Sequence, residues 1–205
     1  MALVINRGFD CSDSAFGIGG YIDVETTGLS HQYDEVIELA LFLFVFHRER
    51  GEIKCIIDEY IGLREPKRPI SEGAFRVHGI RHSDVQGKEL DLSRLNAMIQ
   101  RVEFLIAHNA NFDYGFVRRL LPVCDSKPWL CSMKGIKWRE KGFASVSLPN
   151  LLSVHNIHVN QAHRAGNDVM AALTLLTQTY QGKSYFSELI GNLNRARAHI
   201  QKYAP

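Results

Sequence analysis

The sequence contains little cysteine, and the cysteines it has are not arranged as a disulfide framework or a zinc site. Only four occur in 205 residues, at widely separated positions, and none forms a CxxC pair. Small secreted domains and zinc ribbons use closely spaced cysteines, so neither class is indicated. A reducing, cytoplasmic compartment is the expected location.

The sequence also lacks a long hydrophobic run. Its longest apolar stretch, residues 39–46, is far shorter than the roughly 20 residues that a membrane-spanning helix needs. The apolar residues 2–5 are too few for the core of a signal peptide, and polar residues follow them. We therefore expect a soluble protein with no membrane partner.

A strong excess of charge of one sign is absent as well. The formal net charge is +2, the sequence pI is about 8.3, and 45% of the residues are hydrophobic. This composition is typical of a globular protein. It neither indicates nor excludes nucleic-acid binding, because bound divalent cations can supply local positive charge.

The length and the pattern along the chain predict one well-buried domain with short extensions at both ends. Residues 1–14 end in a polar cluster, which is typical of a loosely held N-terminal extension. We assign residues 15–181 to the main domain. Residues 182–205 are expected to add a C-terminal helix, over about residues 185–203, that packs on the same domain.

Three strand-like segments are followed by alternating helices and strands. The second segment, residues 36–46, is almost continuously apolar, which indicates a strand buried on both faces. Beyond Pro69 the apolar spacing becomes helical, with Ser71 as the expected cap of the first helix. Strands are expected at residues 16–25, 36–46, 54–63, 104–107 and 129–133, and helices at residues 71–77, 92–102, 112–121, 148–154 and 169–180. This order predicts an α/β domain with a central mixed sheet.

Two acidic residues stand close together at the end of the first strand. Asp23 and Glu25 are two positions apart, so their side chains point to the same face of the sheet. Adjacent carboxylates repel each other unless a cation lies between them, and strand ends are where α/β proteins place their sites. The two acids therefore predict a cation site or, alternatively, a pair of solvent-facing acids on an edge strand.

Two further segments contain acidic residues near the starts of helices. Asp113 lies just inside the helix that follows a buried strand, and His163 precedes Asp168 by five residues. Five residues on a regular helix turn through roughly 500°, which would leave the two side chains on different faces. We therefore expect His163 in the preceding loop, with a bend at Gly166 and with Asn167 as the helix cap.

Together the three segments resemble the motifs of a known enzyme family. D-V-E-T-T-G-L from Asp23, H-N-A-N-F-D from His108 and H-R-A-G-N-D from His163 match, in order and spacing, the motifs of the DEDDh 3′–5′ exonucleases. That family includes proofreading subunits of bacterial replicative polymerases and RNases that trim 3′ ends. Gly166 and Asn167 stand where many members carry an aliphatic and an acidic residue. The resemblance covers most of the chain and implies a ribonuclease-H-like fold, with a central five-stranded mixed sheet flanked by helices.

The resemblance implies a metal-dependent hydrolase. It predicts two divalent ions, Mg²⁺ or Mn²⁺, which are the ions that oxygen-rich carboxylate sites favour. By analogy with the family, Asp23 bridges both ions, Glu25 and Asp168 complete the site on the side of the attacking water, and Asp113 completes the second site. His163 is the expected general base, because imidazole titrates close to physiological pH.

The same resemblance implies an exonuclease that releases nucleoside monophosphates from the 3′ end of nucleic acid, with single-stranded or frayed DNA as the favoured substrate. The 3′ end would be bound by the turn after the first strand and by residues near it. The expected substrate-binding residues are Thr26, Thr27, Gly28, Leu29, His78, Asn109 and Phe112. For Leu29 and Phe112, ordinary packing in the core is the alternative.

The sequence leaves other functions open. The substrate could be RNA, which would make the protein a 3′–5′ exoribonuclease or oligoribonuclease, because the choice of sugar depends on the shape of the pocket. The fold could also serve as a non-catalytic module that binds nucleic acid or associates with a polymerase. A polymerase partner and a homodimer are both undetermined.

Two other groups of residues are candidates for binding. His155, His158 and His163 are spaced closely enough for metal ligands, but no cysteine or carboxylate complements them, so structural zinc is disfavoured. Basic residues at 134–141 surround Trp138. This segment either contacts phosphates and stacks on a base, or is a solvated loop.

Overall fold

The structure, a computed structural model, describes residues 3–191. The predicted final helix over residues 185–203 lies partly outside this range, and within the range a helix, α8, covers Tyr185–Ile190. None of the helices in the described part of the chain is both long enough and apolar enough to cross a membrane.

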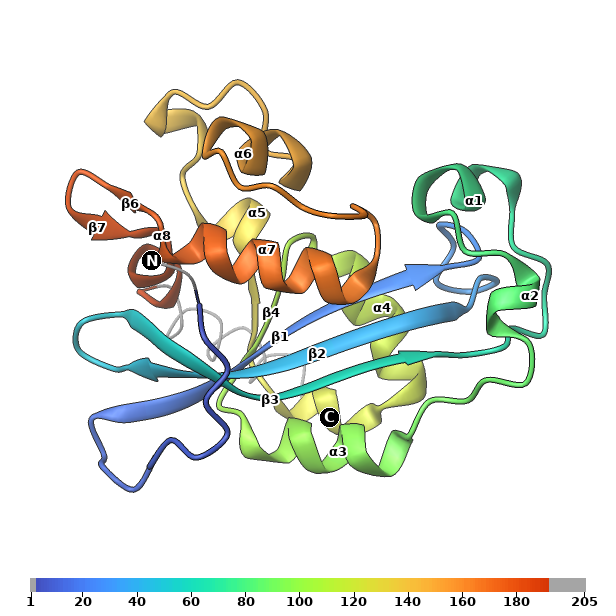
Figure 1. The fold of residues 1–205 in the computed structure, drawn as a ribbon, viewed down its shortest axis with the longest axis horizontal. Coiled ribbons are helices and arrows are strands. Elements are labelled where there is room, and N and C mark those ends of the chain that lie inside the picture. Colours follow the sequence, from blue (N-terminus) through green and yellow to red (C-terminus); the bar gives the residue numbers. More distant parts are fainter. Residues whose placement is uncertain (1–2, 192–205) are drawn as a thin grey trace.

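A five-stranded mixed sheet forms the centre of the protein (Figure 1). The strand order is β3-β2-β1-β4-β5, with the bounds β1 Phe16–Thr26, β2 Val36–His47, β3 Glu52–Leu63, β4 Leu105–Ala107 and β5 Trp129–Cys131. β1, β2 and β3 pair antiparallel, whereas β1, β4 and β5 pair parallel. The predicted five-stranded mixed sheet is therefore confirmed.

Helices cover both faces of this sheet (Figure 1). One face packs against α6 (Leu148–Val154), α7 (Ala165–Thr177) and α8, and the other against α3 (Leu92–Arg101) and α4 (Ala110–Leu120). The remaining elements are short: α1 (Glu72–His78), α2 (His82–Val85), α5 (Ser132–Gly135), two 3-10 turns (Pro122–Ser126 and Arg139–Lys141) and a hairpin of β6 (Thr179–Tyr180) and β7 (Lys183–Ser184). Ser71 caps α1 as predicted, since its Oγ accepts the Ala74 N–H at 3.1 Å.

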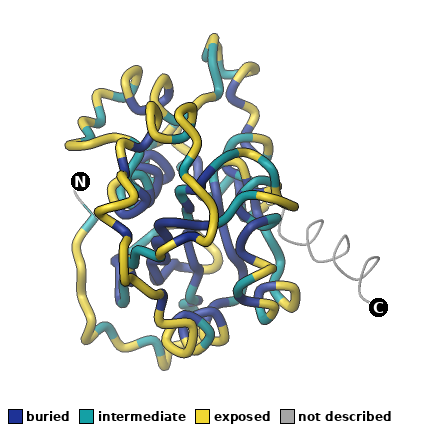
Figure 2. Tube along the Cα trace, turned by 90° about the vertical axis from the view of Figure 1, so that its right-hand side faces the viewer, coloured by how far each residue is buried: buried dark blue, intermediate teal, exposed yellow. Residues whose placement is uncertain are grey.

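β2 is buried along its whole length because helices cover both faces of the sheet. Its side chains alternate between two hydrophobic clusters, with Phe42 and Phe44 on the α7 side and Leu41 and Leu43 on the α3 side. Figure 2 shows the buried segments gathered in the interior and the exposed segments around them. The almost continuous apolar run in the sequence is explained by this two-sided burial.

The N-terminal segment is held more firmly than its polar composition predicts. The Asn6 N–H donates to the Ile56 carbonyl at 2.7 Å, and the Ile56 N–H donates to the Val4 carbonyl at 3.0 Å. Ile5 thereby forms a bridge with Ile56 on β3. β3 is the edge of the main sheet, and the segment pairs with backbone groups that an edge strand leaves open.

Close packing over β1 requires glycine at residue 19. A Cβ at Gly19 would lie 2.5 Å from Cζ of Phe44 and 2.8 Å from Cε2 of Phe104. Both rings are fully buried, so neither can move aside without disturbing the core.

Replacing Gly19 with alanine should reduce the free energy of unfolding by about 1–3 kcal/mol, because over-packing forces buried rings out of their preferred positions. Gly73→Ala is the matched control, since a Cβ at Gly73 meets nothing within 4 Å and alanine favours the helix α1. Urea unfolding monitored by circular dichroism measures both changes. Equal stability of the two variants would contradict the packing described here.

Candidate functional site

The site begins where β1 extends past its neighbour β4. The parallel register between the two strands ends at Tyr21 and Ile106, so the last part of β1 has a strand partner only on the β2 side. Asp23 and Glu25 lie on this last part and are both half-buried, whereas the side chain of Val24 is buried on the opposite face. Strand alternation therefore points both carboxylates to the face that α7 covers.

Asp113 reaches the same place from α4. It lies in the first turn of that helix and is only 3% exposed. Burial raises the pKa of Asp113 to about 7, although hydrogen bonds from its own backbone and from that of Val24 act in the opposite direction. The contact with Val24 brings Asp113 to the β1 backbone beside Asp23.

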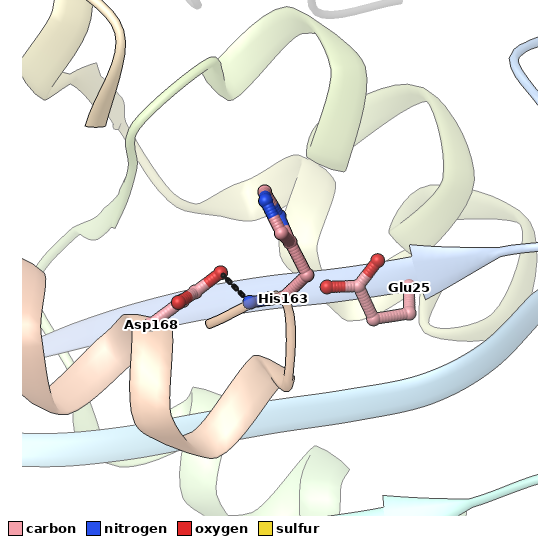
Figure 3. Close-up of side chains that lie close together, drawn as sticks. All are labelled: Glu25, His163 and Asp168. Carbon is pink, nitrogen blue, oxygen red and sulfur yellow. Dashed lines mark hydrogen bonds between the residues drawn. The ribbon is translucent and has the colours of Figure 1, made fainter. Parts of the chain in front are cut away.

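His163 and Asp168 come together because the chain turns sharply before α7. His163 has a φ of 63°, in the left-handed region, and its backbone N–H donates to Oδ2 of Asp168 at 3.2 Å. Glu25, His163 and Asp168 each offer one ligand atom, and these atoms lie within 4.8 Å of one another. Figure 3 shows His163 between the two carboxylates, one from β1 and the other from the first turn of α7. Three of the predicted residues thus form a compact group.

The turn does not lie where the sequence predicts it. α7 begins directly after Arg164, its N-cap, so Gly166 lies inside the helix and Asn167 is not the cap. The bend is at His163, which adopts the left-handed conformation itself. A Cβ at residue 166 would lie 2.4 Å from Cδ1 of Ile61 on β3, the end of an exposed side chain that would have to shift. The predicted bend at Gly166 and cap at Asn167 are therefore wrong, and packing of α7 on the sheet is the physical reason.

A half-buried ion pair that the sequence did not predict holds this turn. Glu38 on β2 is 1% exposed, and it accepts hydrogen bonds from Nε and Nη2 of Arg164 at 3.1 and 2.6 Å. Its second oxygen accepts the backbone N–H of Ala165 at 2.9 Å. The pair ties β2 to the residue next to His163. Glu38 is the one charged residue in the apolar run at residues 36–46, and that isolation is the signal that could have identified it.

The carboxylates are close enough to oppose one another's ionisation. Burial raises the pKa of Glu25 to about 8, and the charges of Asp168 and Glu38 add to the effect. The pKa of Asp23 is raised well above its ordinary range, first by burial and then by the charges of Asp113 and Glu25. Burial also raises the pKa of Asp168. Such a group is costly to ionise unless positive charge is supplied.

The two histidines of the motifs differ in their hydrogen bonding. Nδ1 of His108 lies 3.1 Å from Oγ of Ser132, and Nε2 lies 2.8 Å from the Val146 carbonyl. Both ring nitrogens of His108 are thus engaged, which agrees with a supporting role. Within residues 3–191, no hydrogen bond engages the ring of His163. The ring of His163 is therefore available to exchange a proton with a bound molecule.

The acidic residues and His163 line a cavity of about 720 Å³. Its opposite wall is apolar and comes from α6 and the residues after it: Leu148, Leu152, Ile157 and Val159. A few polar groups that converge beside apolar walls are typical of a ligand site. Sequence reasoning missed this wall because its apolar spacing is equally typical of ordinary core packing.

The turn after β1 uses its threonines internally. Oγ1 of Thr26 donates to the Gly28 carbonyl at 2.6 Å, and Oγ1 of Thr27 donates to Oδ1 of Asp34 at 2.9 Å. Both threonines are buried, whereas Leu29 is 84% exposed. Core packing is therefore wrong as the interpretation of Leu29, and this side chain is the one in the turn that is free to meet a ligand.

His78, predicted as a supporting contact near the 3′ end, is buried and hydrogen-bonded within the protein. It is 6% exposed, its Nδ1 accepts the Ile80 N–H at 3.0 Å, and its Nε2 donates to the Thr26 carbonyl at 3.2 Å. Burial lowers the pKa of His78, which favours this neutral form. These two hydrogen bonds link the end of α1 to the turn after β1, and the predicted contact of His78 with the substrate stays a prediction.

Asn109 and Phe112 both line the cavity, as predicted for substrate-binding residues. Asn109 is exposed at the N-terminus of α4 and makes no capping hydrogen bond with its side chain. The ring of Phe112 packs 4.9 Å from that of Phe116 and 5.8 Å from that of His31, measured between centroids. Phe112 thus belongs to the core on one side and to the cavity on the other.

Two other groups from the sequence have ordinary roles. Trp138 is 1% exposed, so it cannot stack on a base and that hypothesis is wrong. Lys137 and Lys141 in the same segment form ion pairs within the protein. Both ring nitrogens of His155 are engaged in hydrogen bonds, which argues against a zinc site there.

The side chains at the head of the cavity fit a hard divalent cation. Glu25 and Asp168 supply carboxylate oxygens, the ligands that suit Mg²⁺ or Mn²⁺. Asp23 and Asp113 fall outside the compact group of three, but their charges act on the same carboxylates. A cation would offset the repulsion that now raises the pKa values of these groups.

Comparison with protein families decides what kind of acidic cavity this is. The family model described as Exonuclease matches residues 21–176, a range that includes all three motifs. The chain belongs to this exonuclease family. The predicted resemblance to the DEDDh exonucleases is thereby confirmed, together with the ribonuclease-H-like arrangement of the sheet.

Curated relatives of this exonuclease domain include DNA polymerases. DNA polymerase III PolC-type from Bacillus subtilis is 31% identical over 86% of the chain, and the protein of the same name from Thermotoga maritima is 31% identical over 68%. The chain spans only 13% and 9% of the lengths of these two relatives. It therefore corresponds to one segment of each polymerase.

Solved structures of similar fold are exonucleases. Exonuclease X, solved in complex with 5′ overhanging duplex DNA, is 26% identical with a TM-score of 0.58, and the match covers 82% of this chain and 99% of that chain. Exonuclease I is 18% identical with a TM-score of 0.66, covering 86% of this chain and 44% of that chain, and it supports the fold alone.

In the absence of metal, the protein should lose stability as pH rises. The folded-state pKa of Glu25 is raised from 4.5 to about 8, and that of Asp113 from 3.8 to about 7. Between these limits the folded protein holds more protons than the unfolded chain, so its free energy of unfolding falls as pH increases. Thermal unfolding in EDTA should give a lower Tm at about pH 8 than at about pH 6.

Mg²⁺ or Mn²⁺ should reverse this trend, because cations bind deprotonated carboxylates. The rise in Tm on adding metal should be larger at about pH 8 than at about pH 6, and Asp23→Asn should abolish most of it. Asp91→Asn, at the cap of α3, is the matched control and should keep the full response. A Tm that ignores metal at both pH values would contradict the assignment of a cation site.

Replacing Glu38 with glutamine should reduce the free energy of unfolding by about 1–3 kcal/mol, because Arg164 loses its charged partner. Arg164 is 38% exposed, so water screens part of the loss. Glu103→Gln breaks the surface pair with Arg48 and should lower the same free energy by less than about 1 kcal/mol. Urea unfolding compares the two, and equal effects would show that the Glu38 pair is no more than a surface contact.

Proposed function

We propose that the protein is a metal-dependent 3′–5′ exonuclease that releases nucleoside monophosphates from the 3′ end of single-stranded or frayed DNA. The observation that carries this proposal is the convergence of Glu25, His163 and Asp168 within 4.8 Å, at a cavity that Asp23 and Asp113 also line. These five residues come from three separate segments of the chain. A solvent-facing pair of acids on an edge strand would not require such a meeting.

The domain limits belong to the same proposal. Residues 15–181 would form the exonuclease domain, and residues 182–205 would add to it. Burial of Phe186 and Leu189 of α8 in the cluster on the α7 face supports the packing of this addition on the domain.

In the proposed mechanism, Asp23, Glu25, Asp113 and Asp168 hold two divalent ions, Mg²⁺ or Mn²⁺. Such ions, when bound, neutralise charge on the scissile phosphate and help to generate the attacking nucleophile. His163 accepts a proton from the attacking water at one of its ring nitrogens. Its hydrogen bond from the backbone N–H to Asp168 holds the residue at the cavity without using the ring.

The 3′ end would lie along the turn after β1. Leu29 offers an exposed apolar side chain, and Phe112 and Asn109 line the adjoining part of the cavity. Gly28 keeps the turn compact, since a Cβ there would lie 2.6 Å from a carboxylate oxygen of Asp34. The backbone and sugar of a terminal nucleotide would meet this turn at Leu29, its exposed side chain.

The relatives favour DNA over RNA as substrate. The curated relatives are DNA polymerases, and the structure of Exonuclease X contains duplex DNA with a 5′ overhang. The chain matches one segment of each polymerase, so association with a polymerase remains an alternative within the proposal.

A labelled oligonucleotide tests direction, metal and sugar together. A 5′-labelled single-stranded oligodeoxynucleotide incubated with Mg²⁺ should give a ladder of shortened products, and EDTA should abolish it. Asp23→Asn should lower the rate by at least about 100-fold, because the site loses a carboxylate at its centre. Asp91→Asn serves again as the control with unchanged rate.

The matched oligoribonucleotide, run in competition, decides the substrate class. Faster degradation of DNA is expected, and faster degradation of RNA would assign the protein to the exoribonucleases. Full activity of Asp23→Asn would show that the acidic cavity is not the catalytic site.

A further inference from the structure

The segment that leads into the site, residues 156–163, has an unusual backbone. It connects α6 to α7, and several of its side chains line the cavity. Asn156, Gln161 and His163 have positive φ angles of 55°, 58° and 63°. The left-handed region is disfavoured for residues that carry a Cβ. Contacts from outside the segment help to keep this shape, above all at Gln161.

Asn167 supplies two such contacts from the first turn of α7. Its Nδ2 donates to the carbonyl oxygen of Asn160 at 2.6 Å and to that of Gln161 at 3.1 Å. Both partners are acceptors, so only the amino end of the amide can face them. The two bonds hold the peptide groups on either side of Gln161, which lies two residues ahead of His163.

Helix preferences do not account for an asparagine at this position. Residue 167 is the third residue of α7, where an acidic side chain interacts favourably with the helix dipole and where alanine has the higher intrinsic propensity. Aspartate has the same shape as asparagine, but it would turn oxygen atoms toward both carbonyls and repel them. The amide therefore matches the preceding segment rather than the helix that contains it.

Asn167 acts at a different point from the half-buried ion pair. Glu38 holds Arg164, directly after the segment, whereas Asn167 holds residues 160 and 161 within it. Asn167 is exposed and does not line the cavity, so it has no contact with a molecule bound there.

We propose that Asn167 is a positioning residue for His163: its amide ties residues 156–163 to α7 and so keeps the imidazole at the cavity. This inference rests on the proposed role of His163 as general base. It predicts that loss of the amide slows the chemical step without weakening the binding of nucleic acid.

Asn167→Asp and Asn167→Ala test the proposal in the full-length chain. Hydrogen–deuterium exchange of residues 156–163 is measured both with Mg²⁺ and with EDTA, and kcat and KM are measured on a 5′-labelled single-stranded oligodeoxynucleotide. Asn96→Asp is the matched control, because it makes the same chemical change on α3, where the described structure has no hydrogen bond from that side chain.

Both Asn167 variants should exchange the amides of residues 156–163 about tenfold faster, the shift expected from the loss of one or two hydrogen bonds. The amides of residues 156–163 should exchange faster in Asn167→Asp than in Asn167→Ala. Neither should lower the Tm, because both residues suit the first turn of a helix. kcat should fall by about tenfold while KM stays within about twofold, since the base is misplaced but the binding surface is intact. Asn96→Asp should resemble the wild type throughout.

Unchanged exchange in residues 156–163 would overturn the proposal, whatever the activity. A fall in kcat together with a lower Tm would overturn the proposal as well. That result would mean that Asn167 stabilises the fold as a whole. If the wild-type protein degrades no oligonucleotide, the proposed function fails, and the exchange measurement still decides whether Asn167 holds the segment.

Discussion

Carboxylates from β1, α4 and α7 meet at the open end of β1, where burial and neighbouring charges make Asp23 and Glu25 hard to ionise. Burial and mutual repulsion raise the pKa of Glu25 to about 8 and that of Asp23 well above its ordinary range. Such a group either keeps its protons or, when ionised, needs positive charge beside it. The expected need for divalent cations follows from this requirement.

The support for these acids comes from a sheet that is packed on both faces. β2 is buried throughout, and Gly19 on β1 lets the rings of Phe44 and Phe104 close over the strand. Because β4 stops short of the end of β1, the last residues of β1 have α4 instead of a strand on that side, while β2 still pairs with them on the other. The short β4 therefore leaves the open edge where Asp23 and Asp113 approach each other.

The histidine side of the site is held in a different way. His163 lies in a segment with a left-handed backbone, which has little intrinsic preference for its conformation. A half-buried ion pair between Glu38 and Arg164 and the amide of Asn167 hold it from outside. The site thus combines acids on helices and a strand with a histidine, the proposed base, on a segment whose position depends on a few polar contacts.

Much of the site could be predicted from the sequence, because the spacing of Asp23 and Glu25 on a strand settles which way they point, and because motif order identifies the family. The class of fold follows from the order of apolar patterns. The position of the bend at His163, the burial of His78 and the Glu38–Arg164 pair could not be predicted. They depend on contacts between distant segments, as far apart as the 126 residues that separate Glu38 from Arg164. Local spacing therefore determined which residues are the candidates for the chemistry, whereas tertiary packing alone decided how His163 is held beside the acids.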